Sequence, residues 1–267
     1  MNSPLHILVT VRTPELLPAA LLVFQTLRRG FPSAPVYVWG NNLKPEYLPA
    51  VMQAVAVTGG TFNNLQATCH DAWIEQLVLG QAQPFWICDT DMVFFDPVEL
   101  FCDAKDTDYL VGRFEPTWHE PWTNTVHIER LHTCLQWFNP GALRGAIMRW
   151  ARQNVPDVFL DLKVPWIRQH FIPRKGEKTL FYDSTAGIWH ALGGRKFTAT
   201  QNAAFEHLHC GTYSEAVGKC TPLKELPAGH AAIIANPELA RGIQEQQDEF
   251  YATRAIKPAR KGKRGLR

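Results

Sequence analysis

The sequence predicts an α/β fold in which helices cover a mostly parallel β-sheet. Short apolar runs rich in β-branched residues, such as residues 6–11, alternate with segments whose apolar residues recur at helical spacing, such as residues 69–79. This alternation favours a parallel sheet with both faces covered. The chain has 267 residues, 46% of them hydrophobic, which is enough to bury the core of one domain.

The first half of the chain supplies the regular part of this pattern. Thr13, Pro14 and Glu15 are the cap, proline and acid that commonly begin a helix. That helix is expected to end at Gly30, as a left-handed cap after two arginines. Strands are expected at residues 6–11, 36–39, 54–58, 85–88 and 109–112, and a second helix at residues 69–79.

The second half is less regular, and its elements are spaced less evenly. Strands are expected at residues 134–138 and 205–209, and helices at about residues 140–153, 184–192 and 237–251. The last 14 residues, 254–267, are expected to be disordered, because they are basic and poor in apolar residues.

The net charge of +2 conceals an asymmetry along the chain. Residues 254–267 carry seven of the 27 Lys and Arg and no acid, so the rest has 20 basic residues (27 − 7) against 25 acidic ones. An acidic body is not the composition of a nucleic-acid-binding domain. The basic tail either keeps the chain in solution or makes a weak contact with an anionic membrane surface.

Cysteine spacing and the N-terminal residues limit the classes of protein to which this chain can belong. The six cysteines form no CxxC pair, which favours neither a disulfide framework nor a zinc site. The apolar run at residues 7–11 is too short for a signal peptide or a membrane span. We therefore expect a cytoplasmic protein, peripheral at a membrane only if its tail attaches there.

The tripeptide Asp-Thr-Asp occurs twice, at Asp89–Asp91 and at Asp106–Asp108. The first follows the expected strand 85–88 at its carboxyl end, where open sheets bind ligands, whereas the second precedes strand 109–112. Two neighbouring carboxylates repel each other unless a cation lies near them, and Mg²⁺ or Mn²⁺ suits oxygen ligands and phosphates. The first tripeptide is therefore a candidate metal site; the alternative is a polar turn without a ligand.

Two histidines in the late strand are further candidate ligands. His207 and His209 are two residues apart, so on a strand they point to the same face, and Gly211 follows them. A single histidine is more often a core or surface residue. Two on one face before a glycine turn favour a role in binding.

This order of elements and motifs resembles the GT-A glycosyltransferases, in particular the glycogenin-like and lipopolysaccharide-galactosyltransferase group. The resemblance covers most of residues 5–215. It implies a Rossmann-like catalytic domain over residues 1–253, with a nucleotide-binding half at about 5–112 and an acceptor-binding half at 113–253.

The resemblance also implies roles for the motif residues. In the family the second Asp ligates the metal and the first contacts ribose and metal, which assigns Asp91 and Asp89. A late His just before a Gly is the third protein ligand, and His209 is preferred to His207 for it. The family's Lys-Pro-Trp after this glycine is absent here. Residues expected at the nucleotide are Thr10, Arg12, Asp89, Thr90 and Gly211.

Two segments are candidates for contact with the sugars, and each has a structural alternative. Asn139 and Gly141 resemble the Asn-x-Gly that lies beside the donor sugar in the family, but they also suit a turn that begins a helix. Asp183 would contact the acceptor or donor sugar as an acid, or would cap the helix that follows it.

The sequence thus predicts a metal-dependent glycosyltransferase of the hexosyltransferase type. It would move a sugar from a nucleotide-diphosphate sugar to a carbohydrate or glycolipid acceptor, with Mn²⁺ or Mg²⁺. One alternative is a haloacid-dehalogenase-like phosphatase with Asp89 as nucleophile and Asp157 and Asp161 as its later acidic pair. That family places its nucleophile after its first strand. The other alternative is a sugar-nucleotide-binding protein without turnover.

Overall fold

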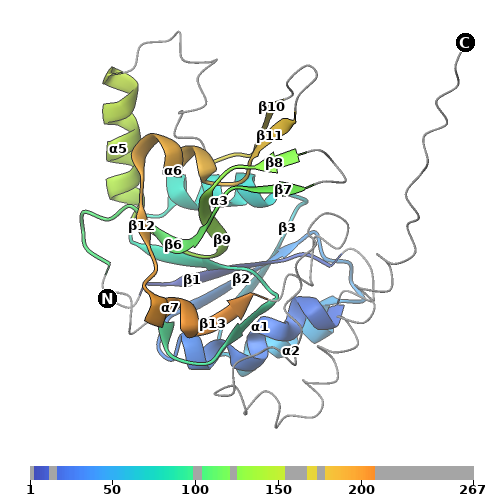
Figure 1. The fold of residues 1–267 in the computed structure, drawn as a ribbon. Helices are drawn as coiled ribbons and strands as arrows, with labels where there is room; N and C mark the ends of the chain where they lie inside the picture. The colour runs from blue at the N-terminus through green and yellow to red at the C-terminus, as the bar shows by residue number, and fades with distance from the viewer. Residues whose placement is uncertain are drawn as a thin grey trace, which may run out of the picture.

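A computed structural model describes residues 3–11, 17–98, 104–120, 125–153, 167–172 and 178–207. Its centre is a seven-stranded sheet in the order β12-β6-β9-β4-β1-β2-β3 (Figure 1). These strands are β1 (Leu5–Val9), β2 (Val36–Asn41), β3 (Thr61–Leu65), β4 (Phe85–Cys88), β6 (Leu110–Glu115), β9 (Arg130–Phe138) and β12 (Arg195–Lys196).

The central sheet is mostly parallel, which confirms the predicted fold class. β1 pairs in parallel with β2 and β4, β2 with β3, and β6 with β12. Only β9 runs against its neighbours β4 and β6. β1, β2, β4 and β6 therefore end at one edge of the sheet, the carboxyl edge, and β9 begins there.

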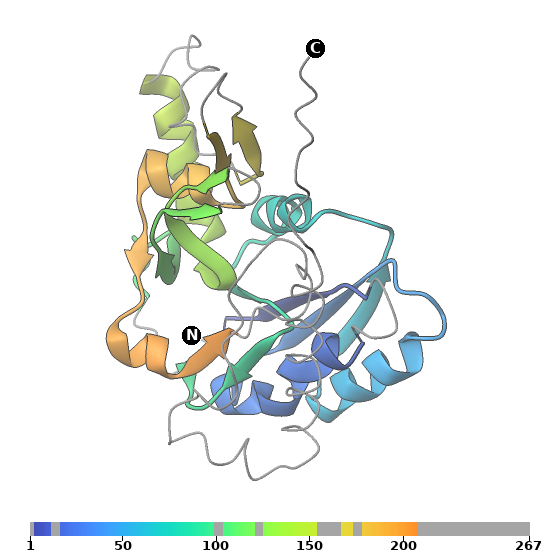
Figure 2. The ribbon, with the colours of Figure 1, turned by 45° about the vertical axis from the view of Figure 1, so that its right-hand side comes forward.

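Helices cover both faces of the sheet, as Figures 1 and 2 show. The helices are α1 (Leu17–Gly30), α2 (Leu48–Val57), α3 (His70–Gly80), α5 (Pro140–Gln153), α6 (Ala186–Leu192) and α7 (Ala199–Ala203). Alternate residues of the buried strands enter two cores. Ile7 packs in the core shared with α1 and α2, whereas Leu8 packs in the core shared with α3, α5 and α6.

Two smaller sheets flank the central one. β5 (Met92–Phe94) pairs antiparallel with β13 (Phe205–His207), which brings the late strand against the Asp89–Asp91 segment. The other sheet has the order β10-β11-β8-β7. Its strands are β10 (His170–Ile172), β11 (Thr179–Tyr182), β8 (Thr125–His127) and β7 (Trp118–Glu120).

The prediction of a strand at residues 54–58 is wrong, because α2 extends to Val57 and the third strand is β3. Ala54–Thr58 is a short apolar run that suits either a buried strand or a helix face. Pro49 lies at the start of α2, where its missing N–H is not needed. Only Val51 and Val55 of α2 are buried, at the four-residue spacing of one helix face.

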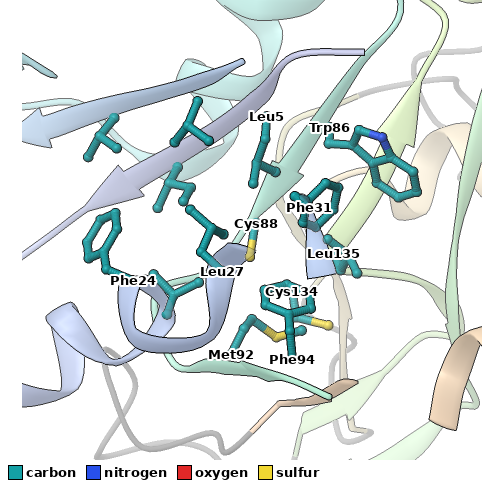
Figure 3. Packing of buried hydrophobic residues seen from close by; sticks show 14 of the residues in the cluster. Leu5, Phe24, Leu27, Phe31, Trp86, Cys88, Met92, Phe94, Cys134 and Leu135 are labelled. Atoms are coloured by element: carbon teal, nitrogen blue, oxygen red, sulfur yellow. The ribbon is translucent and has the colours of Figure 1, made fainter. Parts of the chain in front are cut away.

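Gly30 ends α1 as expected, but its backbone conformation is not the expected one. The glycines with positive φ are Gly59 and Gly193 among the described residues, so Gly30 is not a left-handed cap. A Cβ added to Gly30 would lie 2.4 Å from the Phe94 ring. Its hydrogen side chain therefore allows α1 to approach β5, in the packing that Figure 3 shows around Phe31, Met92 and Phe94.

The other predicted elements agree with the structure or lie outside the described residues. Strand 85–88 and the end of the helix at Gln153 match, and the remaining described strands and helices shift by a few residues at their ends. The start of the first helix at Thr13, the helix at 237–251 and the tail at 254–267 are not among the described residues. No described helix is long and apolar enough to cross a membrane.

Candidate active site

Asp89–Asp91 forms the short link between β4 and β5 at the carboxyl edge. Its backbone is held from both sides: Asp89 N–H donates to the Cys134 carbonyl oxygen at 2.8 Å, and the Thr90 carbonyl oxygen accepts from Val23 N–H at 2.9 Å. Thr90 and Asp91 are buried, whereas the Asp89 side chain keeps 26% of its surface exposed. The link thus presents one buried carboxylate, Asp91, and one partly exposed carboxylate, Asp89.

His207 reaches these carboxylates from the end of β13. The register pairs His207 with Met92, next to Asp91. The Nε2 atom of His207 lies 3.0 Å from Asp91 Oδ1 and 3.7 Å from Asp89 Oδ2. One ligand atom from each of the three residues lies within 4.8 Å of the other two, an arrangement that could hold a metal ion.

Burial and neighbouring charges strongly shift the pKa values of the side chains in this cluster. Burial raises the pKa of Asp89 to about 6; His70 and His207 oppose the shift, while Asp91 and Asp183 add to it. For His207, burial lowers the pKa, but Asp91 and Cys134 outweigh it and raise the pKa well above its usual value. Strongly shifted groups that gather in one place are typical of functional sites.

His70 is a member of the site that the sequence reasoning missed. It is the first residue of α3, and its Nε2 atom lies 3.6 Å from Asp89 Oδ1. Its ring stacks on Trp73, with the ring centroids 5.7 Å apart. Asp89 therefore has a histidine near each of its two carboxylate oxygens.

Strand directions bring a second polar group to the same edge. Glu115 ends β6 and Arg130 begins β9, and the two residues are register partners. The Nη2 atom of Arg130 lies 2.8 Å from Glu115 Oε2 and 2.9 Å from Asp183 Oδ2. The Nε2 atom of His132 lies 3.7 Å from Glu115 Oε2, and the His132 and His207 ring centroids are 5.0 Å apart. Glu115, Arg130 and Asp183 thus connect to the carboxylate pair through two histidines.

Asp183 is held in place on every side. Its Oδ1 accepts from Gln169 Nε2 at 2.8 Å and from Ser184 N–H at 2.7 Å, while Oδ2 faces Arg130. Two residues on, Thr185 has φ 67°, a left-handed backbone that non-glycine residues rarely adopt. The buried Gln136 side chain donates to Thr185 Oγ1 at 3.0 Å and so supports that conformation.

Neither family models nor curated proteins match the sequence, but the fold is similar to solved structures, glycosyltransferases among them. An active-site mutant of LgtC is 12% identical, with TM-score 0.47 over 90% of this chain and 99% of that one. Mannosyltransferase PcManGT from Pyrobaculum calidifontis, in complex with GDP-Man and Mn²⁺, is 14% identical, with TM-score 0.41 over 97% and 77%. The bifunctional WbbM is 10% identical, with TM-score 0.37 over 55% of this chain and only 34% of WbbM. All three are glycosyltransferases, the class that the sequence resembles, and all three similarities are weak.

Asn139, a predicted catalytic residue, lies away from Asp89 and Asp91. It follows β9, which runs against β4, and therefore lies at the edge of the sheet opposite Asp89. Its Oδ1 accepts from Ala142 N–H at 3.1 Å, so it caps α5, and its Nδ2 donates to the Asp106 carbonyl oxygen at 3.0 Å. The structural alternative, a turn that begins a helix, is the one observed.

The nucleotide residues expected near the first strand are only partly described. Thr10 follows β1 at the carboxyl edge, where its Oγ1 accepts from Asn41 Nδ2 at 3.2 Å. Asn41 also exchanges two hydrogen bonds with the Thr68 backbone, which ties together the segments after β1, β2 and β3. Arg12, His209 and Gly211 lie outside the described residues, as do Asp157 and Asp161.

No local signal marks His70, Glu115, Arg130 or His132 as site residues. None of these residues belongs to a recognisable sequence motif. The signal that would have found three of them is topological: a strand antiparallel to β4 and β6 begins where those strands end. The sequence pattern does not predict that β9 lies between β4 and β6.

Proposed function

We propose that this chain transfers a sugar from a nucleotide-diphosphate sugar to an acceptor hydroxyl, with a divalent ion held by Asp89, Asp91 and His207. The observation that carries the proposal is the convergence of these three side chains, within 4.8 Å, at the carboxyl edge of a mostly parallel sheet. This is the edge at which open α/β sheets bind ligands.

The donor set fits a hard divalent cation such as Mn²⁺ or Mg²⁺. Two carboxylates and one imidazole offer two oxygens and one nitrogen, and a cation there would relieve the mutual repulsion of the carboxylates. Three protein ligands also leave coordination positions for phosphate oxygens. An ion so held would supply Lewis-acid stabilisation of the negative charge on the departing diphosphate.

The protein's own groups have separate tasks in this proposal. Asn41 and Thr10 organise the edge near the expected nucleotide, and Asp183 is rigid enough to orient a sugar hydroxyl. Glu115 makes its described contacts through Oε2, and its side chain is 19% exposed. In an inverting transfer, Glu115 Oε1 would take the proton of the acceptor hydroxyl. Glu115→Gln would then abolish transfer and retain metal-dependent nucleotide binding.

Calorimetric titration with UDP and with GDP, in the presence and absence of Mn²⁺, tests the proposal. Metal-dependent binding of a nucleoside diphosphate, followed by transfer from its sugar conjugate, would support it. Hydrolysis of a generic phosphate ester without nucleotide binding would identify the phosphatase with Asp89 as nucleophile. Nucleotide binding without transfer to any acceptor would identify a binding protein.

Two finer parts of the proposal concern the acceptor and the tail. We take the acceptor to be a carbohydrate or glycolipid, and residues 113–253 to form the acceptor-binding half of the domain. A glycolipid acceptor would suit a cytoplasmic enzyme whose basic residues 254–267 make weak contact with an anionic membrane. A chain ending at Thr253 should then bind anionic vesicles less well than the full chain does.

A further inference from the structure

A second group of metal-binding side chains adjoins the carboxylate pair. Ligand atoms of His132, Cys134 and His207 all lie within 4.8 Å of one another. Cys134 and His207 are buried, and 13% of the His132 side chain is exposed. His207 belongs to both groups, because it also faces Asp89 and Asp91.

An irregularity in β9 creates this second group. Gly112 pairs with Gln136, but the next residue of β6, Arg113, pairs with His132, so three residues of β9 have no partner in β6. Cys134 lies in this bulge, and its backbone N–H donates to His132 Nδ1 at 2.9 Å instead of to a neighbouring strand. Gln136 Nε2 donates to the Leu131 carbonyl oxygen at 2.6 Å across the same bulge. Bulges beside active sites commonly re-aim side chains.

The two groups differ in donor chemistry. Asp89, Asp91 and His207 offer two oxygens and a nitrogen, which suit hard ions such as Mn²⁺ and Mg²⁺. His132, Cys134 and His207 offer two nitrogens and a sulfur, a softer set that suits Zn²⁺. Zn²⁺ sites with three protein ligands keep a fourth position for water.

We propose that His132, Cys134 and His207 form a distinct Zn²⁺ site that competes with the hard-ion site for His207. A Zn²⁺ ion bound by the Nε2 atom of His207, which lies 3.0 Å from Asp91 Oδ1, would leave the carboxylates without their nitrogen ligand. The competition rests on the proposed function, whereas Zn²⁺ binding itself does not.

Binding requires defined proton and hydrogen-bond changes. The Cys134 thiol and the His207 ring each lose a proton to solvent, since a thiolate and a neutral imidazole nitrogen are the ligands. His132 gives up the hydrogen bond that Nδ1 accepts from Cys134 N–H, which frees that lone pair for the metal. Its Nε2–H then faces Glu115 Oε2, 3.7 Å away. Metal-bound histidines almost always donate their other N–H to such a group.

Zn²⁺ titration of variants separates the two sites. We expect Cys134→Ala to weaken Zn²⁺ binding about 10-fold or more and to leave Mn²⁺ binding unchanged. Asp91→Asn should do the opposite, and His207→Ala should weaken both. Cys88→Ala is the matched control, because Cys88 is equally buried on the adjacent strand but does not belong to the group. Equal Zn²⁺ affinity in Cys134→Ala and wild type would overturn the proposal.

Co²⁺ in place of Zn²⁺ gives a readout that needs no activity. Thiolate coordination produces a near-ultraviolet charge-transfer band, which we expect in wild type and Cys88→Ala and not in Cys134→Ala. If Cys134→Ala does not fold, His132→Gln serves in its place and should weaken the band. A wild-type protein without the band would overturn the proposal. If the band is present but Mn²⁺ and nucleoside diphosphates do not bind wild type, the Zn²⁺ site stands and the proposed function fails.

Discussion

The two Asp-Thr-Asp tripeptides are identical in sequence and lie at opposite edges of the same sheet. Asp89–Asp91 follows β4 at the carboxyl edge, where His207 and His70 approach it. Asp106–Asp108 precedes β6 at the other edge, beside the Asn139 that caps α5. The difference shows that the position of a short acidic motif relative to its strand decides which partners it meets.

The charges of the two tripeptides are balanced in different ways. Asp108 Oδ2 accepts from Arg195 Nε at 2.9 Å and from Lys105 N–H at 2.9 Å, so the protein itself provides its partners. Asp89 faces His70 and His207 instead of an arginine or lysine, and burial raises the pKa of Asp89 to about 6. An added cation therefore benefits the first pair more than the second.

The largest expected effect separates the two motifs directly. Asp91→Asn should weaken Mn²⁺-dependent binding of UDP or GDP by at least about 100-fold, because it removes a buried ligand oxygen. Asp108→Asn should leave that affinity unchanged. Isothermal titration calorimetry measures both, and equal losses in the two variants would contradict the assignment of the metal site to the carboxyl edge.

A smaller loss is expected when the third ligand is removed. His207→Ala should reduce Mn²⁺ affinity about 10- to 100-fold, since two carboxylates remain. The control is His190→Ala, because His190 contacts the Glu129 backbone at 3.0 Å and belongs to neither metal group. Unchanged Mn²⁺ affinity in His207→Ala would point to His209 as the third ligand.

The pH dependence of stability should also distinguish the motifs. Burial raises the pKa of Asp89 in the folded protein to about 6, against a usual value of 3.8. The protonated carboxyl therefore contributes its full share of the folding stability below pH 3.8, and this share is lost as the pH rises to about 6. The melting temperature of the metal-free protein should therefore fall by a few degrees more across this window in wild type than in Asp89→Asn.

Added metal should reverse this trend, because it binds the deprotonated carboxylates. The melting temperature difference between samples with Mn²⁺ and with a chelator should increase with pH in wild type. A difference that is constant from pH 4 to 7, or that persists in Asp89→Asn, would contradict a metal site at Asp89.

The smallest expected effect concerns the second motif alone. Asp108→Asn breaks its ion pair with Arg195, whose side chain is 27% exposed, and should lower the free energy of unfolding by no more than about 1 kcal/mol. Urea denaturation measures it. A much larger loss would mean that the Asp106–Asp108 segment has a role beyond a local turn.

The local sequence pattern was sufficient to predict an element wherever its strand or helix signal was unambiguous. Phe85–Cys88 is all apolar and is a buried strand, and the Asp pair that follows it therefore lies at the carboxyl edge. The prediction for residues 54–58 was wrong because a five-residue apolar run does not distinguish a strand from a helix face. The position of Asn139 could not be predicted, because it depends on the direction of β9, which residue types do not reveal.

The sequence by itself determined the fold class, the alternation of strands and helices, and the placement of Asp89 and Asp91 after a buried strand. These follow from hydrophobic periodicity and local turn chemistry, which act over a few residues. Only the tertiary structure decided that His70, Glu115, Arg130 and His132 gather near that pair, and that His207, a candidate from the sequence, contacts it. Their contacts depend on the antiparallel insertion of β9, its bulge and the pairing of β13 with β5, and such long-range pairings are set by the packing of the whole sheet.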